Sequence, residues 1–181
     1  MKLAAAMDVG PPLVRTFEFQ HDLCNESLLT LRGLSEAGFR LPSGGVECTG
    51  WGGGDSLPTP CDRLSVSAAI ASVASTAEWF ILRNLEKLPA YRVLMDRVLT
   101  QIGARFSNIE FNRPMCFAFV SSPCVSVPIH IDPEHNFLFQ IQGTKTVWAH
   151  PDTAGGVTSE ELRAFYADEV GFQLDARPTR N

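Results

Sequence analysis

Apolar residues recur at helical spacing in the first part of the chain. In residues 25–37 four leucines follow one helix face, with Asn25 as the predicted N-cap. A second helix is predicted over residues 90–103, opened by Pro89. Its apolar side chains form one stripe that predicts a buried face: Tyr91, Leu94, Met95, Val98, Leu99 and Ile102.

The spacing changes to that of strands in the second part of the chain. Residues 78–83 predict a short strand, and the Gly- and Pro-rich residues 42–60 predict a long loop. Beyond Phe106, four more strands separated by turns are predicted, at 115–121, 125–131, 137–142 and 144–149. A capping box at residues 158–161 predicts a final helix to about Val170.

Helices followed by strands predict an α+β fold in which successive antiparallel strands form a barrel or jelly roll. We expect residues 1–110 to be a mainly helical region that packs on the barrel. Residues 111–181 would then supply the first half of that barrel, within one structural domain overall.

Composition narrows the class of protein. The chain has 45% hydrophobic residues and a net charge of −5, without a cluster of Lys or Arg, which argues against nucleic-acid binding. The apolar stretches are too short and interrupted to predict a membrane span. Five irregularly spaced cysteines without a Cys-x-x-Cys pair argue against a thiolate zinc site, and we expect reduced thiols in a cytoplasmic protein.

The candidate chemistry lies between residues 127 and 145. His130 and Asp132 are two apart on a predicted strand, so their side chains point to the same face. An imidazole and a carboxylate so placed supply two of the three ligands of the facial triad that binds iron(II). A strand-end histidine that hydrogen-bonds its neighbouring carboxylate is the structural alternative.

Lys145 stands alone at the start of an apolar strand. It is the only lysine after Lys87. If it is buried, its cation needs an anionic partner. If it lies at a strand edge, the side chain reaches solvent instead. Phe137 and Phe139 share a strand face opposite Asn136, so we expect them to pack in the core rather than line a substrate pocket.

The stretch from His130 to Lys145 resembles the core motif of the JmjC/cupin-like iron(II)- and 2-oxoglutarate-dependent oxygenases, particularly the asparaginyl hydroxylases and bacterial cupin-like proteins. The resemblance implies a partial double-stranded β-helix, with His130 and Asp132 as iron ligands. It also implies that Lys145 holds the distal carboxylate of 2-oxoglutarate, and that Asn136 reaches the cosubstrate. The similarity covers residues 117–151.

Two positions depart from that family. Val127 stands where the similar hydroxylases carry a threonine that anchors the cosubstrate. The family's third metal ligand is a distal histidine, and no histidine follows His150; His21, His135 and His150 are poor substitutes by position. We therefore expect a chain truncated relative to the family, inactive on its own, with an exposed barrel edge that favours a homodimer.

Three functions remain open at this point. The first is hydroxylation of a small-molecule or peptide substrate, with iron(II) and 2-oxoglutarate as cofactors. The second is a non-catalytic relative with a weak or absent metal site. The third is a metal-binding module that borrows a ligand from a partner chain.

Overall fold

The computed structural model describes residues 18–49, 59–60, 70, 73, 79–106, 109–123, 125–127 and 136–148. The described residues Phe19–Val125 belong to one compact unit. Glu18 and the described residues from Ser126 on belong to a second unit. Each unit is described by itself.

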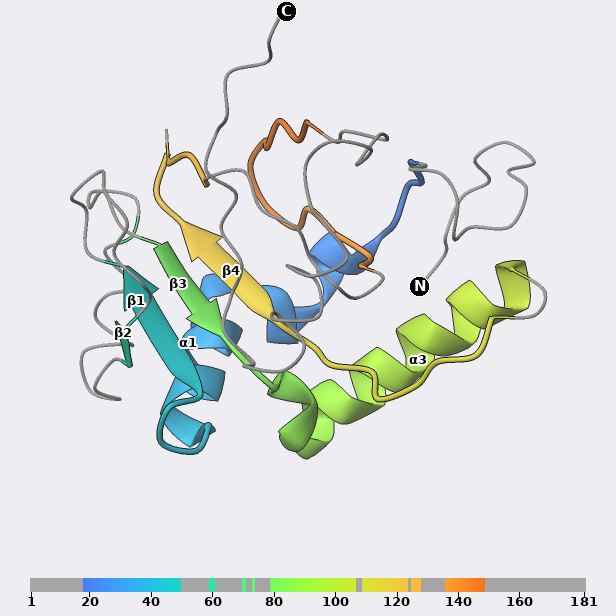
Figure 1. The fold of residues 1–181 in the computed structure, drawn as a ribbon, viewed down its shortest axis with the longest axis horizontal. Coiled ribbons are helices and arrows are strands. Elements are labelled where there is room, and N and C mark those ends of the chain that lie inside the picture. Colours follow the sequence, from blue (N-terminus) through green and yellow to red (C-terminus); the bar gives the residue numbers. More distant parts are fainter. Residues whose placement is uncertain are drawn as a thin grey trace, which may run out of the picture. The chain divides into compact units, whose positions relative to one another are not determined.

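The first unit contains a four-stranded antiparallel sheet in the order β2-β1-β3-β4 (Figure 1). The strands are β1 Val46–Thr49, β2 Thr59–Pro60, β3 Trp79–Leu82 and β4 Ala118–Ser121. In the register, Val46 lies opposite Leu82, and Phe80 lies opposite Val120. Because paired residues project to the same side of a sheet, these four side chains form one continuous apolar face.

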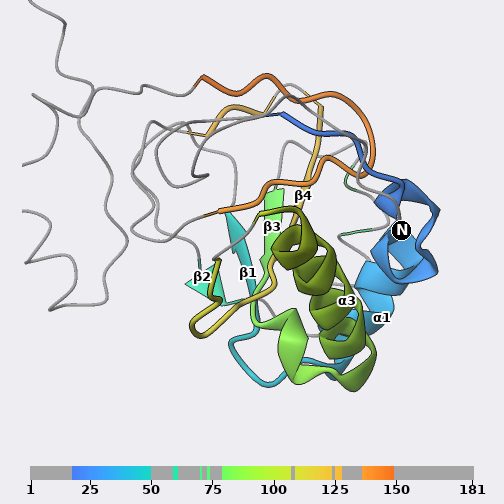
Figure 2. The ribbon, with the colours of Figure 1, turned by 90° about the vertical axis from the view of Figure 1, so that its right-hand side faces the viewer.

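Among the described residues, helices α1 and α3 and the 3-10 turns η1, η2 and η3 accompany the sheet. The helices are α1 Leu31–Arg40 and α3 Pro89–Arg105, and the turns are η1 Leu23–Asn25, η2 Ser27–Leu29 and η3 Leu85–Lys87. Helix α1 lies behind the sheet in the view of Figure 1, and Figure 2 shows the same layering from the side. Helix α1 therefore covers the apolar face of the sheet, and α3 adds Tyr91 to the core.

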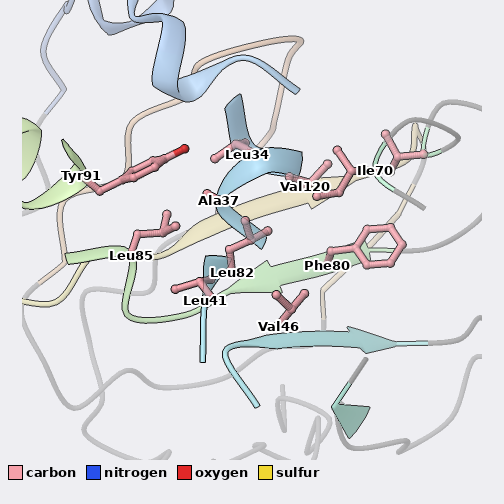
Figure 3. Close-up of a cluster of buried hydrophobic side chains, with 11 residues drawn as sticks. Leu34, Ala37, Leu41, Val46, Ile70, Phe80, Leu82, Leu85, Tyr91 and Val120 are labelled. Atoms are coloured by element: carbon pink, nitrogen blue, oxygen red, sulfur yellow. The ribbon is translucent and has the colours of Figure 1, made fainter. Parts of the chain in front are cut away.

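The core lies between this sheet face and the helices (Figure 3). Phe80, Leu82 and Leu85 are fully buried, as is Leu41 at the C-terminal end of α1. The cluster combines residues from both helices, three strands and the connecting segments: Leu34, Ala37, Leu41, Val46, Ile70, Val73, Phe80, Leu82, Leu85, Tyr91 and Val120. Burial of this apolar surface is the main stabilising term of the unit.

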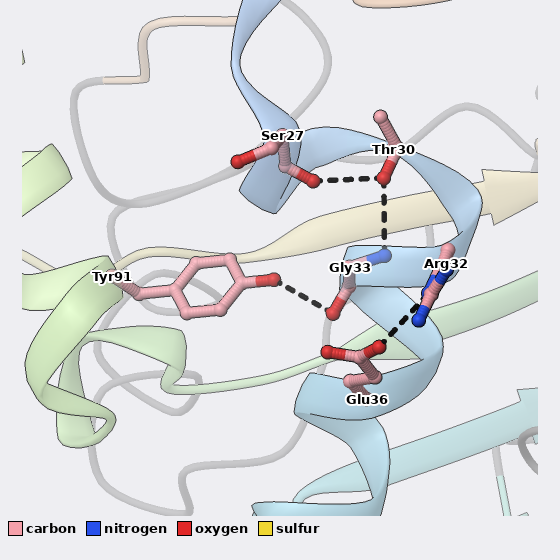
Figure 4. A network of polar contacts seen from close by, with 6 residues as sticks. All are labelled: Ser27, Thr30, Arg32, Gly33, Glu36 and Tyr91. Carbon is pink, nitrogen blue, oxygen red and sulfur yellow. Dashed lines mark hydrogen bonds and ion pairs between the residues drawn. The ribbon is translucent and has the colours of Figure 1, made fainter.

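Tyr91 joins α3 to the start of α1 (Figure 4). Its hydroxyl lies 2.6 Å from the carbonyl oxygen of Leu28 and 3.1 Å from that of Gly33, as a hydrogen-bond donor. The backbone of the turn η2 lies close to the start of α1 because position 33 has no side chain. A Cβ there would lie 2.5 Å from the carbonyl oxygen of Ser27. Burial, and then the nearby Cys116 and Glu36, raise the pKa of Tyr91 to about 12.

The first predicted helix differs from the observed one. Residues 23–29 form two 3-10 turns, and the α-helix begins at Leu31. Asn25 is not its cap. The cap is Thr30, whose Oγ1 accepts a hydrogen bond from the backbone N–H of Gly33 at 3.1 Å and donates to the Ser27 carbonyl at 2.8 Å. The prediction failed because the leucine spacing continues through turns that are not α-helical.

The second helix and the strand before it are confirmed. Helix α3 begins at Pro89, and its buried residues are five of the six in the predicted stripe, with Leu99 partly buried. Strand β3 falls within the predicted residues 78–83. Strand β4 occupies the second half of the predicted strand 115–121.

The long loop predicted over residues 42–60 is wrong, since β1 and β2 lie within it. Its Gly- and Pro-rich composition resembles a loop, but β1 pairs along its whole length with β3. The mixed α+β class is confirmed. The predicted boundary between regions 1–110 and 111–181 stays a prediction. Strand β3, from the first region, pairs with β4, from the second.

The later strands are not observed in the part of the chain that the structure describes. Residues 125–127 and 136–148 contain no assigned strand, so the predicted strand at 137–142 is not observed, nor is one in the described part of 144–149. Most of the predicted strand 125–131 lies outside the described residues. Alternation of apolar and polar residues is satisfied by an extended chain, but a strand also needs a hydrogen-bonding neighbour. The jelly roll is therefore not part of the described architecture.

We expect Tyr91→Phe to lower the free energy of unfolding by about 1–2 kcal/mol, because two partly buried carbonyl acceptors lose their donor while the ring remains. Urea denaturation measures this change. Val93→Ala, at an exposed position of the same helix, is the control and should change stability by about 0.5 kcal/mol or less. Equal effects of the two substitutions would contradict the role given to the hydroxyl.

Stability should also fall at alkaline pH through Tyr91. Because the pKa of Tyr91 is higher in the folded chain than in the unfolded chain, folding favours the protonated phenol. The stabilisation by Tyr91 is therefore complete below the ordinary pKa of 10.0 and is lost as the pH rises toward about 12. Urea midpoints of the wild type and Tyr91→Phe across this range provide the measurement. The difference between them should shrink as the pH rises, and a constant difference would contradict the raised pKa.

Candidate functional site

Asn136 and Lys145 lie on the described segment 136–148, whose trace turns back on itself (Figure 2). Exposure alternates along its first part. Asn136, Leu138 and Gln140 are exposed, whereas Phe137 and Phe139 are half-buried. This alternation is typical of extended backbone and agrees with the expectation that the two phenylalanines face away from Asn136.

The reversal of the segment is centred on Gly143. Its φ is +76°, in the left-handed region that disfavours residues with a side chain. Beside it, the side-chain amide of Gln140 donates a hydrogen bond from Nε2 to the carbonyl oxygen of Gln142 at 2.7 Å. Lys145 follows two residues after the glycine, and its side chain is exposed. The described segment thus carries Asn136 before the turn and Lys145 after it.

The predicted metal ligands His130 and Asp132 lie outside the described residues, as do His135 and His150. The prediction that His130 and Asp132 face one cavity stays a prediction. Within the described ranges, no three His, Cys, Asp or Glu side chains gather in a way that could hold a metal ion.

His21 is the candidate third ligand that the structure does describe. Its Nδ1 accepts a hydrogen bond from the backbone N–H of Leu23 at 3.2 Å, at the start of η1. A lone pair that accepts this hydrogen bond is not available to a metal ion. The bond supports the expectation that His21 has a structural role.

Val127 is exposed in the structure, with 46% of its surface accessible. Its isopropyl group has no hydrogen-bonding atom, so it offers a bound carboxylate no hydroxyl donor. Anchoring of an anion in this part of the chain would therefore depend on Lys145 and Asn136, whose side chains carry donors.

A cluster that was not predicted from the sequence lies on the sheet face opposite the core. Arg83 Nε lies 2.8 Å from Glu47 Oε1, and its guanidinium lies 5.4 Å from the centre of the Phe117 ring. Met115, Phe117 and Phe119 lie at alternate positions and are all exposed. The i, i+2 spacing of these three residues is the signal that could have identified this face.

Cys116 is not an activated nucleophile. Burial, and then the Glu86 carboxylate, raise the pKa of its thiol to about 11. A Glu86 oxygen also accepts a hydrogen bond from the Cys116 backbone N–H at 2.9 Å. A thiol with a raised pKa contributes little thiolate near neutral pH, so thiol chemistry at this residue is disfavoured.

No protein-family model, curated protein or solved structure matches the chain. The helices that the structure describes lack the length and apolar character needed to cross a lipid bilayer. Candidate chemistry is therefore assigned from the residues themselves. His130 and Asp132 carry donor atoms suited to iron(II), and Lys145 carries a cation suited to a carboxylate.

We expect the chain to bind manganese(II), a surrogate for iron(II), through His130 and Asp132. Replacing either ligand by alanine should weaken binding more than about tenfold, because even residues that only support metal ligands contribute about this much. Electron paramagnetic resonance of free manganese measures the affinity. His21→Ala is the matched control and should bind as the wild type does. Loss of binding in that control alone would contradict the assignment.

Proposed function

We propose that this chain carries the metal and cosubstrate site of an iron(II)- and 2-oxoglutarate-dependent oxygenase of the JmjC/cupin-like type, on a partial double-stranded β-helix. The observation that carries the proposal is the order of chemical groups from residue 130 to residue 145. An imidazole and a carboxylate at i, i+2 are followed by an amide and then by the ammonium of Lys145, the only lysine in the sequence after Lys87. The described segment supports it, because Asn136 and Lys145 lie on the two sides of one turn.

The donor set fits both cofactors. His130 and Asp132 would hold iron(II) and leave further positions open for the cosubstrate. The chemistry supplied by the bound metal and cosubstrate is hydroxylation of an unactivated C–H bond by dioxygen, coupled to decarboxylation of 2-oxoglutarate to succinate. The task of this chain's residues is to hold both cofactors in one orientation.

Lys145 would determine which 2-oxo acid binds. Its ammonium would donate charge-assisted hydrogen bonds to the distal carboxylate of 2-oxoglutarate. Such bonds contribute about 1.5–3 kcal/mol each, which corresponds to roughly 10- to 100-fold in affinity. Lys145 would therefore select a dicarboxylate over a 2-oxo acid that lacks the distal group. The amide of Asn136 would add a donor on the metal side of the cosubstrate.

A metal-binding module without turnover is the second candidate. One observation favours it: the histidine that the structure describes, His21, already uses Nδ1 in a backbone hydrogen bond. That leaves His135 and His150 as the histidines available for a third ligand within this sequence. Binding of manganese without binding of 2-oxoglutarate would support this candidate.

Substrate, location and assembly are also proposals. The substrate would be a small molecule or a peptide. The free thiols of Cys24 and Cys116 are in keeping with a reducing, cytoplasmic environment. A homodimer through a barrel edge stays a prediction from the sequence.

Binding of 2-oxoglutarate to the iron(II)-loaded chain without oxygen tests the proposal, measured by the charge-transfer absorption of the metal–oxo-acid complex. Lys145→Ala should weaken the affinity for 2-oxoglutarate at least about tenfold, because the distal carboxylate loses its cation. Lys87→Ala, at another exposed lysine, is the matched control and should leave the affinity unchanged. Equal affinities of Lys145→Ala and the wild type would contradict the assignment of 2-oxoglutarate.

A further inference from the structure

The turn that precedes Lys145 is fixed from both of its sides. Before it, the Gln140 side chain donates from Nε2 to the backbone carbonyl oxygen of Gln142 at 2.7 Å. After that carbonyl, Gly143 has φ +76°. The same peptide group, between Gln142 and Gly143, is therefore held by a hydrogen bond at its oxygen and by a backbone conformation that favours glycine.

We propose that Gln140 is a positioning residue for Lys145, acting through this peptide group to direct the ammonium toward the distal carboxylate of a bound dicarboxylate. The inference rests on the proposed function of Lys145. Gln140 touches neither cofactor in this proposal. Its side-chain amide donates a hydrogen bond to the backbone of the turn, and the conformation of that backbone sets the direction of the Lys145 side chain.

A positioning residue is needed because the lysine side chain is flexible. Four flexible carbons separate the ammonium from the backbone, and ordering them costs conformational entropy. Lys145 is exposed, so packing does not restrict this side chain fully. If the backbone direction at residue 145 also varied, the cation would spread over a larger volume and bind an anion less tightly.

The chemistry of the glutamine side chain explains why this residue type suits the position. Its amide nitrogen is a donor and carries no charge, so it bonds a carbonyl oxygen without attracting or repelling the anion that Lys145 would bind. Asn136, Leu138 and Gln140 occupy alternate positions of the segment, and all three are exposed. Glutamine therefore fixes the turn while leaving the local charge to Lys145.

The test compares Gln140→Leu with Gln142→Leu. The first removes the donor; the second removes an equivalent side chain but keeps the accepting backbone carbonyl. Affinity is measured anaerobically in the iron(II)-loaded chain for two ligands, 2-oxoglutarate and 2-oxobutanoate, which lacks the distal carboxylate. Manganese affinity is measured in parallel, because it reports on the metal pair alone.

We expect Gln140→Leu to weaken 2-oxoglutarate binding by about 3- to 10-fold, the value of one hydrogen bond. Binding of 2-oxobutanoate and of manganese should be unchanged, as should every affinity of Gln142→Leu. Gly143→Ala should reproduce the selective loss, because alanine disfavours the left-handed conformation by about 1–2 kcal/mol. A general disturbance of the segment would weaken both oxo acids equally and would overturn the proposal.

The outcomes separate this inference from the proposed function. If Lys145→Ala loses 2-oxoglutarate affinity while Gln140→Leu keeps it, the proposed function of Lys145 is supported and the positioning role of Gln140 is wrong. If neither substitution changes the affinity, the function of Lys145 is wrong and the inference falls with it. Selective loss in both variants, with 2-oxobutanoate unaffected, supports both.

Discussion

The described core depends on one contact, the hydrogen bonds by which Tyr91 connects α3 to the start of α1. Tyr91 reaches from α3 to the carbonyl oxygens of Leu28 and Gly33, where α1 begins. The contact requires a glycine at position 33, because any side chain there would collide with the backbone of the preceding turn. With α1 held in this way, its apolar face packs with Tyr91 of α3 and with the core side chains of β1, β3 and β4. Hydrophobic burial supplies most of the energy, and the tyrosine hydroxyl fixes where α1 starts.

The candidate site depends on a different kind of constraint, which is local in sequence. Asn136 and Lys145 are nine positions apart, yet the turn at Gly143 brings the chain back on itself between them. The assignment of His130 and Asp132 as a metal pair rests on their i, i+2 spacing in the sequence. In the proposed site, selectivity for a dicarboxylate would depend on Lys145, because Val127 carries no hydroxyl. Such a site should be sensitive to backbone changes near Lys145.

The sequence predicted best where the decisive information was local. Pro89 and the apolar stripe after it determined α3, and the apolar run at residues 79–82 predicted β3. The pattern failed where pairing with distant residues decides the structure. Residues 46–49 lie in a Gly- and Pro-rich stretch typical of a loop, yet they pair with β3. By contrast, residues 136–140 alternate in exposure as a strand does, yet no strand is assigned to them. The Thr30 cap and the Gln140 hydrogen bond could not be predicted, because both depend on the exact path of a turn.

The central claim is that the metal pair and Lys145 belong to one site. Paramagnetic relaxation by bound manganese(II) tests this most directly, because broadening of nuclear magnetic resonance signals falls off steeply with distance from the metal. We expect substoichiometric manganese to broaden the signals of Asn136 and Lys145, and Asp132→Ala to remove the effect. Sharp Asn136 and Lys145 signals in the manganese-bound chain, or broadening that persists in Asp132→Ala, would contradict it.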